Sequence, residues 1–470
     1  MIRISISVAT TGFQVFLRVF LQVFHKPSNF PTPAFETFDW FARNAPAYTA
    51  WHLNLSVDPP RKPMLKQAMK DIRVLDLSRI LAGPWCTQNL ADLGADVIKI
   101  EHPGSGDDTR GWGPPFLEIP GGDDRFSAYF LACNRGKRSI AIDFAKPEGA
   151  ALVQRLAAQA DVVIENFRSG TLAKYGLDYA SLNALNPRLV YLSITGFGQD
   201  GPMAGKPGYD YVFQGFGGLM SYTGHRDDEP GAGPLRAGAS VIDLSTGMYA
   251  SVAVLGALLM RAQTGTGQHI DLALADVAVA INANQNLNYL VSGRPPVRTG
   301  NSHPNLAPYE VFACADGHLI LAIGNDAQFT RFCALAECPE LARDARFVTN
   351  AQRLDHLVEL RREVAHRLSR RTRAEWQKRF DAAGIPWGPI NTLDQVFDDP
   401  QTKHRQLRQT LLHPAAGEIP TVCNPLARSA ALETRAPPLL GEHTREVLAT
   451  LNLDDAAIAQ LEASGVVRTH

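Results

Sequence analysis

Short apolar runs alternate with helix-like segments from Asp71 onward, and this alternation restricts the chain to few folds. Helical patterns lie between the runs, at 83–94, 147–160 and 178–185. The runs that read as buried strands are IRVLDLS (72–78), DVIKIE (96–101), SIAIDF (139–144), DVVIENF (161–167) and RLVYLSI (188–194). Strands that alternate with helices pair in parallel, and the helices cover the faces of the sheet. We therefore predict an α/β fold with a Rossmann-like open parallel sheet.

The second half of the chain predicts a further unit. A long helix over 244–262, closed by Gly265 and Gly267, leads into the strand pattern at 269–276. The Pro/Gly-rich stretch 292–309 then separates it from DGHLILAIG (316–324) and helices near 326–383, and GIPWGPIN (384–391) returns the chain to the large domain. A chain of 470 residues is too long for one typical domain. We expect 64–291 and 391–470 to form the large domain and 292–390 a smaller α+β domain with its linkers.

The first 63 residues differ from the remainder. Residues 1–35 contain no Asp or Glu, and the apolar run 13–24 is interrupted by Arg18, which makes it too short for a membrane span. An acid-poor, basic segment is typical of an organellar transit peptide. The alternatives are a disordered extension, or a true start at Met64 or Met69. We expect a cytoplasmic protein, or a mitochondrial one if residues 1–63 are a transit peptide.

Charge and cysteine usage exclude several classes of function. The net charge of −1 provides no basic excess for general binding to nucleic acid or to a membrane surface. The six cysteines lack CxxC pairs, so we expect reduced thiols and no metal site. The turn SRILAGPW (78–85) after the first strand lacks GxGxxG, and Glu101 is followed by a loop rather than a helix. A nicotinamide cofactor is therefore not expected.

One acid, Asp243, lies in RAGASVIDLSTGMYA (236–250), where a strand-like run becomes the long helix. The positive end of a helix dipole favours a charged carboxylate, which keeps it nucleophilic. Asp243 is therefore the candidate catalytic residue. The alternative is an ordinary N-cap ahead of Ser245 and Thr246, because Asp is a preferred capping residue.

Several long motifs in one order carry a family resemblance. They are VLDLSRILAGPWCTQNLADLGADVIKIEHPGSGDDTRGWGPPF (74–116), NRGKRSIAIDF (134–144), ADVVIENFRSGTLAKYGLDY (160–179), NPRLVYLSITGFGQDGP (186–202), GQHIDLALAD (267–276) and APPLLGEHTREVL (436–448). From about Asp71 to the C-terminus the chain resembles the class III coenzyme A-transferases, the group of formyl-CoA transferase and carnitine CoA-transferase. The resemblance implies a large domain built from both chain ends, a smaller middle domain, and two ring-like subunits interlocked as a homodimer.

The resemblance also implies a mechanism. Asp243 occupies the position of the family's nucleophilic aspartate, which forms a mixed anhydride and then an aspartyl-CoA thioester before an acceptor acid takes the CoA. An acyl-CoA and a small carboxylic acid are then the substrates, and no tightly bound cofactor is implied. The segment RTGNSHPNLAPY (298–309), with Asn301 and His303, is either the loop over the acyl group or an interdomain turn.

By position, the resemblance places the family's CoA contacts on ten residues. These are Ile80, Leu81, His102, Ile142, Asp143, Phe144, Asn166, Phe167, Arg168 and Lys174. Arg168 and Lys174 suit the phosphates, since Arg binds them in bidentate fashion and Lys supplies a point charge. A solvated helix face is the alternative for both.

Departures from formyl-CoA transferase bear on the substrate. The positions of Leu81 and His102 are Gln and Arg in that enzyme, and its glycine-rich loop is replaced here by TGNSHPN (299–305). These changes favour a bulkier acyl group, such as the dicarboxylates succinate or glutarate. Basic residues that could answer a distal carboxylate, or simply end a solvated strand, are Arg135, Lys137 and Arg138.

Two other functions remain open at this level. The superfamily includes α-methylacyl-CoA racemases, in which a His precedes an Asp; here that motif reads GYDY (208–211), with Tyr209 in the His position. A phenol with a pKa of about 10 is poorly suited to that acid–base task. A non-catalytic CoA-binding paralogue is the other alternative, and the presence of Asp243 argues against it.

Overall fold

The computed structural model describes residues 2–10, 13–21, 50–54, 67–121, 124–426 and 434–470. The chain forms two compact units, Met1–Met64 and Leu65–His470. The first contains a three-stranded antiparallel sheet in the order β2-β1-β3, formed by β1 (Ile2–Thr10), β2 (Phe13–Leu21) and β3 (Ala50–Asn54). A disordered extension was one of the alternatives for this segment, but IRISISV alternates apolar and other residues with the period of a strand. The rest of this predicted extension lies outside the described residues.

A seven-stranded sheet organises the second unit. Its order is β13-β10-β9-β4-β5-β8-β19, and every pairing is parallel except that of β19 with β8. The strands are β4 (Arg73–Asp76), β5 (Asp96–Glu101), β8 (Lys137–Ile142), β9 (Val162–Glu165), β10 (Val190–Thr195), β13 (Gln268–Ala273) and β19 (Val467–Arg468). The predicted α/β fold with a mostly parallel sheet is confirmed. The short antiparallel β19 was not predicted, because two residues give no periodic signal.

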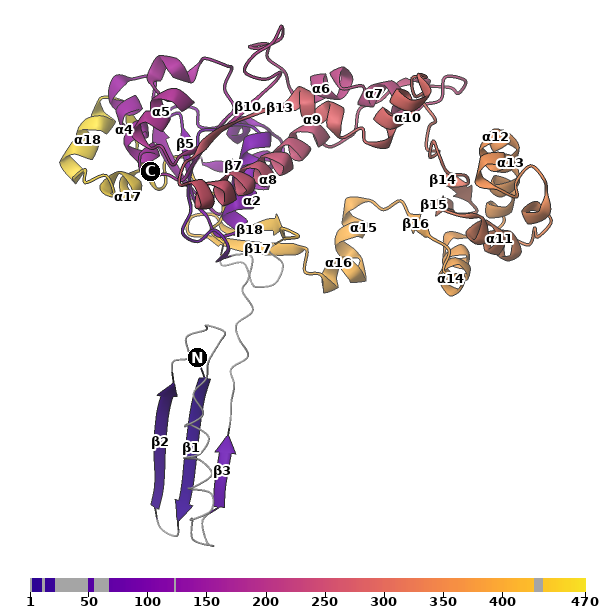
Figure 1. The fold of residues 1–470 in the computed structure, drawn as a ribbon, viewed down its shortest axis with the longest axis horizontal. Helices are drawn as coiled ribbons and strands as arrows, with labels where there is room; N and C mark the ends of the chain where they lie inside the picture. Colours follow the sequence, from indigo (N-terminus) through magenta and orange to yellow (C-terminus); the bar gives the residue numbers. More distant parts are fainter. Residues whose placement is uncertain (1, 11–12, 22–49, 55–66, 122–123, 427–433) are drawn as a thin grey trace. The chain divides into compact units, whose positions relative to one another are not determined.

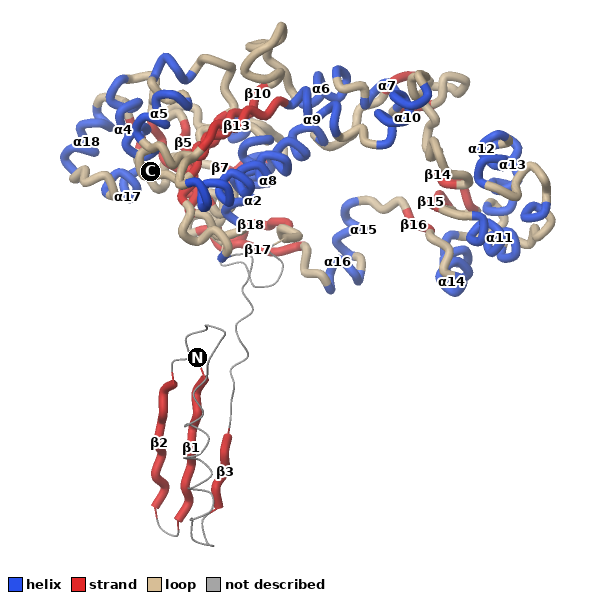
Figure 2. The backbone as a smooth tube through the Cα atoms, viewed as in Figure 1, coloured by secondary structure: helices blue, strands red, loops and turns tan. Residues whose placement is uncertain are grey.

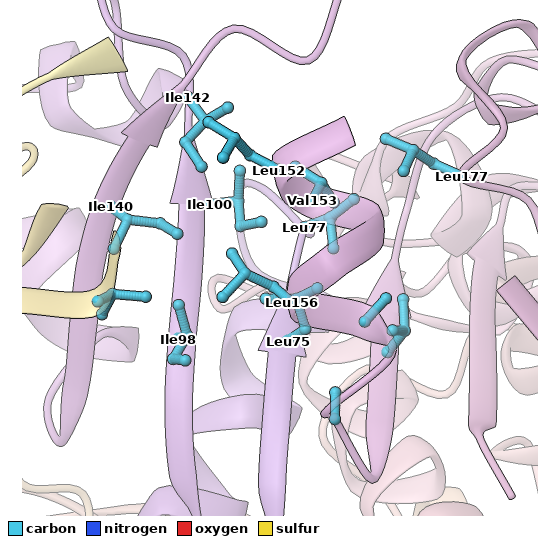
Figure 3. Packing of buried hydrophobic residues seen from close by; sticks show 14 of the residues in the cluster. Leu75, Leu77, Ile98, Ile100, Ile140, Ile142, Leu152, Val153, Leu156 and Leu177 are labelled. Atoms are coloured by element: carbon cyan, nitrogen blue, oxygen red, sulfur yellow. The ribbon is translucent and has the colours of Figure 1, made fainter. Parts of the chain in front are cut away.

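Helices cover both faces of this sheet (Figure 1). On one face α4 (Pro147–Ala157), α5 (Tyr179–Leu185), α17 (Thr444–Ala449) and α18 (Asp455–Ala463) contribute to a single core with the strands. Figure 3 shows Leu152, Val153 and Leu156 of α4 among Leu75 and Ile100 of the strands. The other face is covered by α2 (Ala82–Asp92), α8 (Val241–Thr264) and α9 (Leu274–Ala280). Because parallel strands are buried on both faces, their sequences are nearly continuous apolar runs.

The helix α8 is long and apolar enough to cross a membrane by length and composition alone. In the structure it packs against α2, α9, β10 and β13. Its buried positions include Ile242, Ala250 and Val254, which join the core on that face of the sheet. One side of the helix therefore belongs to the core of this fold, whereas other apolar side chains such as Val252 and Leu259 are exposed.

A separate core contains residues from Ala307 to Ile385 only. It surrounds the antiparallel sheet β14 (Tyr309–Cys314), β15 (Gly317–Ala322) and β16 (Trp387–Pro389). The helices that pack on this sheet are α11 (Asp326–Leu335), α12 (Asn350–Asp355), α13 (Leu357–Leu368) and α14 (Arg373–Ala383). Strand β15 was predicted, whereas β14 falls partly in the stretch that we expected to be a linker.

The remaining elements are short, and Figure 2 shows that loops connect most of them. Hairpins are formed by β6 (Phe116–Glu118) with β7 (Arg125–Ser127), β11 (Gly224–His225) with β12 (Gly233–Pro234), and β17 (Arg408–His413) with β18 (Gly417–Val422). The other helices are α3 (Ala128–Cys133), α6 (Asp210–Phe216), α7 (Leu219–Tyr222), α10 (Asn284–Ser292), α15 (Leu393–Asp398) and α16 (Pro400–His404).

Candidate active site

Asp243 lies in the first turn of α8, because the helix begins at Val241 rather than at the predicted residue 244. Its side chain is buried, with 9% exposure. The N-cap residue is Ser240, whose side chain makes no capping hydrogen bond. No described residue donates a hydrogen bond to the Asp243 carboxylate. Asp243 is therefore not the N-cap that the alternative interpretation required.

Another carboxylate caps this helix. Asp210 Oδ1 accepts hydrogen bonds from the backbone N–H of Ile242 (2.7 Å) and of Asp243 (3.0 Å). The first N–H groups of a helix have no partner within it, so a carboxylate placed here satisfies them and interacts favourably with the helix dipole. Asp210 thus fixes the turn that carries the candidate nucleophile.

The electrostatic environment of Asp243 differs from the prediction. Burial and, second, the nearby Asp210 raise the pKa of Asp243 from its usual 3.8 to about 7. We expected the helix dipole to favour the charged form. Desolvation and a like charge both disfavour it, and together they outweigh the dipole here.

Gln214 connects Asp210 to the loop before α8. Its Nε2 donates to Asp210 Oδ2 (2.6 Å), and its Oε1 accepts from the backbone N–H of Ala237 (2.9 Å). Asp210 is the first residue of α6, and Gln214 follows one turn later. The motif GYDY contained this signal, although sequence reasoning used it only to compare Tyr209 with the racemase histidine. Tyr209 itself is 63% exposed.

A cavity of about 690 Å³ lies beside the first turn of α8. Trp112 and Tyr129 meet edge to face at one wall, with ring centroids 5.1 Å apart. Leu81, one of the predicted CoA contacts, also lines it. The full lining is Leu81, Trp85, Trp112, Gly113, Pro114, Pro115, Ala128, Tyr129, Ala132, Gly238, Ala239, Ser240 and Leu244. This space is largely apolar and suits the acyl end of a thioester.

A second cavity, of about 280 Å³, lies at the carboxyl ends of β4, β5, β8 and β9. This is the edge of an open α/β sheet where ligands usually bind. Half of the ten predicted CoA contacts line it: His102, Ile142, Asp143, Phe144 and Phe167. The structure therefore brings these five together, while Leu81 lines the first cavity. Their role in binding CoA stays a prediction.

The loop between β4 and α2 is held in a strained conformation. Ile80 has a φ of 72°, in the left-handed region that a β-branched residue rarely occupies. Its backbone N–H faces both oxygens of the buried Asp107 carboxylate, at 3.3 Å. Lys99 Nζ contacts Asp107 Oδ2 (2.8 Å) and donates to the carbonyl oxygen of Ser78 (2.8 Å). Such strain persists only where surrounding groups fix it, and it concentrates at ligand sites.

Asn166 holds the same loop from the next strand. Its Oδ1 accepts from the backbone N–H of Arg79 (2.8 Å), and its Nδ2 donates to the Arg79 carbonyl oxygen (2.7 Å). Asn166 therefore positions the loop, a function that the sequence did not reveal. Ile80, the other predicted contact here, offers backbone rather than side-chain chemistry.

One exposed cation lines the second cavity, and two of the predicted CoA contacts are also exposed cations. Arg79 was missed by the sequence reasoning; it lines the cavity, lies over the Phe167 ring (5.1 Å) and pairs with the exposed Asp108 (3.0 Å). Arg168 and Lys174 are exposed and have no ion-pair partner among the described residues. Arg168 and Lys174 are therefore available to anionic groups, whereas Arg79 already pairs with Asp108.

The basic residues considered for a distal carboxylate are already paired. Lys137 is fully buried against Asp76 (3.1 Å), and Arg135 binds Asp92 (2.6 Å). Arg138 binds Asp96 (2.6 Å) and Glu446 (3.0 Å). These three residues therefore neither await a substrate carboxylate nor end a solvated strand, because they form internal ion pairs. Lys137 lies 61 residues from Asp76 in sequence, and Arg135 lies 43 residues from Asp92. Sequence reasoning about neighbouring residues could not predict these pairs.

The loop with Asn301 and His303 is tied to the small sheet. The His303 ring stacks on Tyr309, with centroids 5.1 Å apart, and its backbone N–H donates to the Tyr309 carbonyl oxygen (2.9 Å). These contacts suit the interdomain turn. A role over the acyl group stays a prediction.

Comparison with known proteins decides the family. Residues 69–444 match the family model for CoA-transferase family III. The chain belongs to CoA-transferase family III. Among its relatives, this CoA-transferase is 51% identical over 395 residues to the succinate–glutarate CoA-transferase of Agrobacterium fabrum, covering 84% of this chain and 97% of the relative.

Two further comparisons agree. The family III CoA-transferase is 41% identical over 406 residues to the succinyl-CoA:glutarate CoA-transferase of Mus musculus, covering 86% and 91% of the two chains. The crystal structure of a CAIB/BAIF family protein from Brucella suis superposes with a TM-score of 0.71 at 48% identity, covering 81% of this chain and 98% of that one. The predicted family and enzyme class are confirmed.

Proposed function

We propose that this CoA-transferase moves CoA from a dicarboxylic acyl-CoA such as succinyl-CoA to a second dicarboxylic acid such as glutarate, through a thioester on Asp243. The observation that carries the proposal is the buried Asp243 carboxylate in the first turn of α8, where the neighbouring Ser240 and Leu244 line a largely apolar cavity. The names of the relatives in Agrobacterium fabrum and Mus musculus support these substrates.

The proposed steps exchange bonds without net proton transfer. The Asp243 carboxylate attacks the carbonyl carbon of the donor thioester. The C–S bond breaks, CoA departs as the thiolate, and the acyl group remains on Asp243 as a mixed anhydride. The thiolate then attacks the Asp243 carbonyl and releases the donor acid as carboxylate. The acceptor carboxylate attacks the aspartyl thioester, and the thiolate finally attacks the acyl carbon, which frees Asp243. Burial supports this sequence, because water would hydrolyse the anhydride.

CoA is proposed to lie along the carboxyl ends of the strands, with the thioester end beside Asp243. The cavity that His102, Asp143, Phe167 and Arg79 line would hold the nucleotide end. The exposed Arg168 and Lys174 would then bind its phosphates. The strained loop at Ile80 joins this cavity to the one lined by Leu81. A rigid loop reduces the entropy lost on binding.

Arg236 is the proposed partner of the distal carboxylate. It begins the loop whose residues Gly238–Ser240 line the acyl cavity. Among the described residues it has no carboxylate partner: it lies over Tyr211 (5.6 Å) and bonds only the carbonyl oxygens of Ala237 and Gly238. A guanidinium without a carboxylate partner can bind a substrate carboxylate in bidentate fashion.

Asp243→Asn tests the covalent mechanism. The variant should fold and bind CoA but lose transfer, because an amide cannot form the anhydride. Incubation with succinyl-CoA and then hydroxylamine should mark residue 243 of the wild type only, as read by peptide mass spectrometry. Asp276→Asn is the matched control, since Asp276 is an exposed acid at the third position of α9. Near-normal transfer by Asp243→Asn would refute the mechanism.

We propose further that the chain acts as a homodimer. Large apolar side chains are exposed on α8 and α10: Met248, Tyr249, Val252, Leu259, Met260, Leu287, Tyr289, Leu290 and Val291. A second copy would remove this surface from water. An interlocked pair cannot separate without unfolding, so dilution should yield no folded monomer. Sedimentation at low concentration checks this, and a folded monomer would contradict it.

The domain limits and the extension are also part of the proposal. A chain that begins at Met64 should fold and transfer CoA like the full chain, since the motifs of the family begin after that residue. Its loss of activity would contradict this. We propose a cytoplasmic location; cell fractionation with N-terminal sequencing separates this from mitochondrial import with removal of the extension.

A further inference from the structure

Asp210 has three hydrogen bonds, and two of them end on the turn that carries the nucleophile. Its Oδ1 accepts the N–H groups of Ile242 and Asp243, and its Oδ2 accepts from Gln214. The side chain is 7% exposed. A capping Ser or Asn would satisfy the same donors without charge. The structure instead places a second buried acid next to the first.

We propose that Asp210 is a positioning residue for the transfer reaction: it fixes the first turn of α8, and its charge drives the Asp243 carboxylate toward the uncharged, acyl-linked states of the enzyme. The inference rests on the proposed covalent function of Asp243. It adds a residue to the reaction that touches no substrate.

The physical reason is repulsion that only the free enzyme experiences. When Asp243 is ionised, its charge lies near that of Asp210 with little water to screen it. When Asp243 becomes an anhydride or a thioester, its charge is gone and the repulsion ends. Asp210 therefore raises the free energy of the free enzyme relative to the covalent intermediates.

The effect on pH dependence follows from the same repulsion. Burial and Asp210 raise the pKa of Asp243 to about 7. Among the described residues, the titratable side chains that interact with Asp243 are Asp210 of α6 and Tyr129 of α3. Burial raises the pKa of Tyr129 above its usual value, so this phenol stays neutral near pH 7. Burial is therefore the larger cause of the raised pKa of Asp243, and Asp210 is the neighbouring acid that adds to it.

Asp210→Asn tests the inference, because Asn keeps an acceptor oxygen for the two N–H groups and removes the charge. Two quantities are measured: the acid limb of kcat/KM against pH, and the fraction of enzyme held as thioester at equilibrium with succinyl-CoA and succinate. The limb should move to lower pH by roughly one unit or more, as expected for loss of a nearby like charge. Above the limb, the ratio of thioester to free enzyme should fall by the same factor, about tenfold for each pH unit.

Asp454→Asn is the matched control. Asp454 caps α18 by accepting from the N–H of Ala457 (2.8 Å), far from the site in sequence. The control should leave both quantities unchanged. If Asp210→Asn folds and shows the wild-type limb and occupancy, the inference is wrong.

Two outcomes separate the inference from the function on which it rests. If the wild type never becomes labelled at residue 243, the covalent function fails. If the wild type is labelled and Asp210→Asn behaves like it, only the role of Asp210 fails. Should Asp210→Asn not fold, Asp210→Glu decides: it keeps the charge, so its acid limb must stay in place even where its maximal rate falls. A limb displaced to lower pH in that variant would overturn the inference.

Discussion

Replacing Lys99 by Met should destabilise the protein by breaking a fully buried ion pair. Lys99 Nζ and Asp107 Oδ2 are 2.8 Å apart, and both side chains have 0% exposure. Burial alone would raise the pKa of Asp107, but the Lys99 ammonium overcomes it and lowers the pKa from 3.8 to about 2. That difference corresponds to about 2 kcal/mol of stability at neutral pH. Lys99→Met removes this contribution and leaves a buried charge without its partner.

The expected cost is about 3–5 kcal/mol, the usual range when one partner of a buried pair is removed. For a cooperative unit of about 400 residues, an unfolding entropy near 2.1 cal/mol/K per residue converts this to a fall in Tm of about 4–6 °C. Differential scanning calorimetry at pH 7 measures it. The difference in Tm between the variant and the wild type should become smaller as the pH falls. Asp107 has no cationic partner in the variant, so it is protonated at a higher pH there and its buried charge is lost.

Lys403→Met provides the control. Lys403 pairs with Asp398 at a similar distance, 3.0 Å, but the two side chains are 61% and 80% exposed. Exposed pairs contribute about 0–1 kcal/mol, so this Tm should change by about 1 °C or less. Equal shifts for the two variants would show that the buried pair does not stabilise the loop at Ile80.

Three further predictions address the site and its support. Asp243→Asn should raise the free energy of unfolding by up to about 4 kcal/mol at pH 8 and by much less at pH 4, because the ionised form of Asp243 becomes destabilising as the pH rises from 3.8 through its raised pKa of about 7. Denaturant titration at both pH values measures this free energy, and an equal gain at the two pH values would contradict the prediction. Gly247→Ala should lower Tm by about 1–4 °C, since the added Cβ would lie 2.8 Å from the Ala82 carbonyl oxygen and 2.9 Å from Trp85; an unchanged melting curve would show that α2 and α8 can move apart. Arg236→Gln should raise KM for glutarate at least about tenfold and leave KM for a monocarboxylic acid unchanged, because only glutarate loses a charged hydrogen bond to its second carboxylate. Steady-state kinetics measures both KM values, and equal changes for the two acids would exclude Arg236 as the partner of the distal carboxylate.

Local sequence was enough to predict the sheet and not enough to predict the site. Apolar runs such as DVIKIE mark buried strands because each strand is covered on both faces. The turn that carries Asp243 is capped by Asp210, which precedes it by 33 residues, and no periodic pattern joins the two. Arg79 and Asn166 are 87 residues apart, yet Asn166 holds the backbone of Arg79, which lines the second cavity.

Long-range pairing also explains the wrong interpretation of the basic cluster. Arg135, Lys137 and Arg138 look like a solvated or ligand-binding group when only neighbouring residues are considered. Their partners Asp92, Asp76 and Asp96 follow from the parallel alignment of β4, β5 and β8 and from the packing of α2. The direction of the Asp243 pKa was mispredicted for a related reason: the helix dipole is visible in sequence, whereas burial is not.

The pairing of β19 with β8 has a consequence for synthesis of the protein. Val467 aligns with Ile142, and the backbone N–H of Ser139 and Ala141 meets His443 and Thr444, which lie 304 and 303 residues later. While the ribosome translates the intervening residues, the outer edge of β8 has none of these partners. An open strand edge is a template for pairing with another nascent chain. The large domain therefore finishes folding only after translation of its last segment, and chaperones that shield strand edges should raise its yield more than slower translation does.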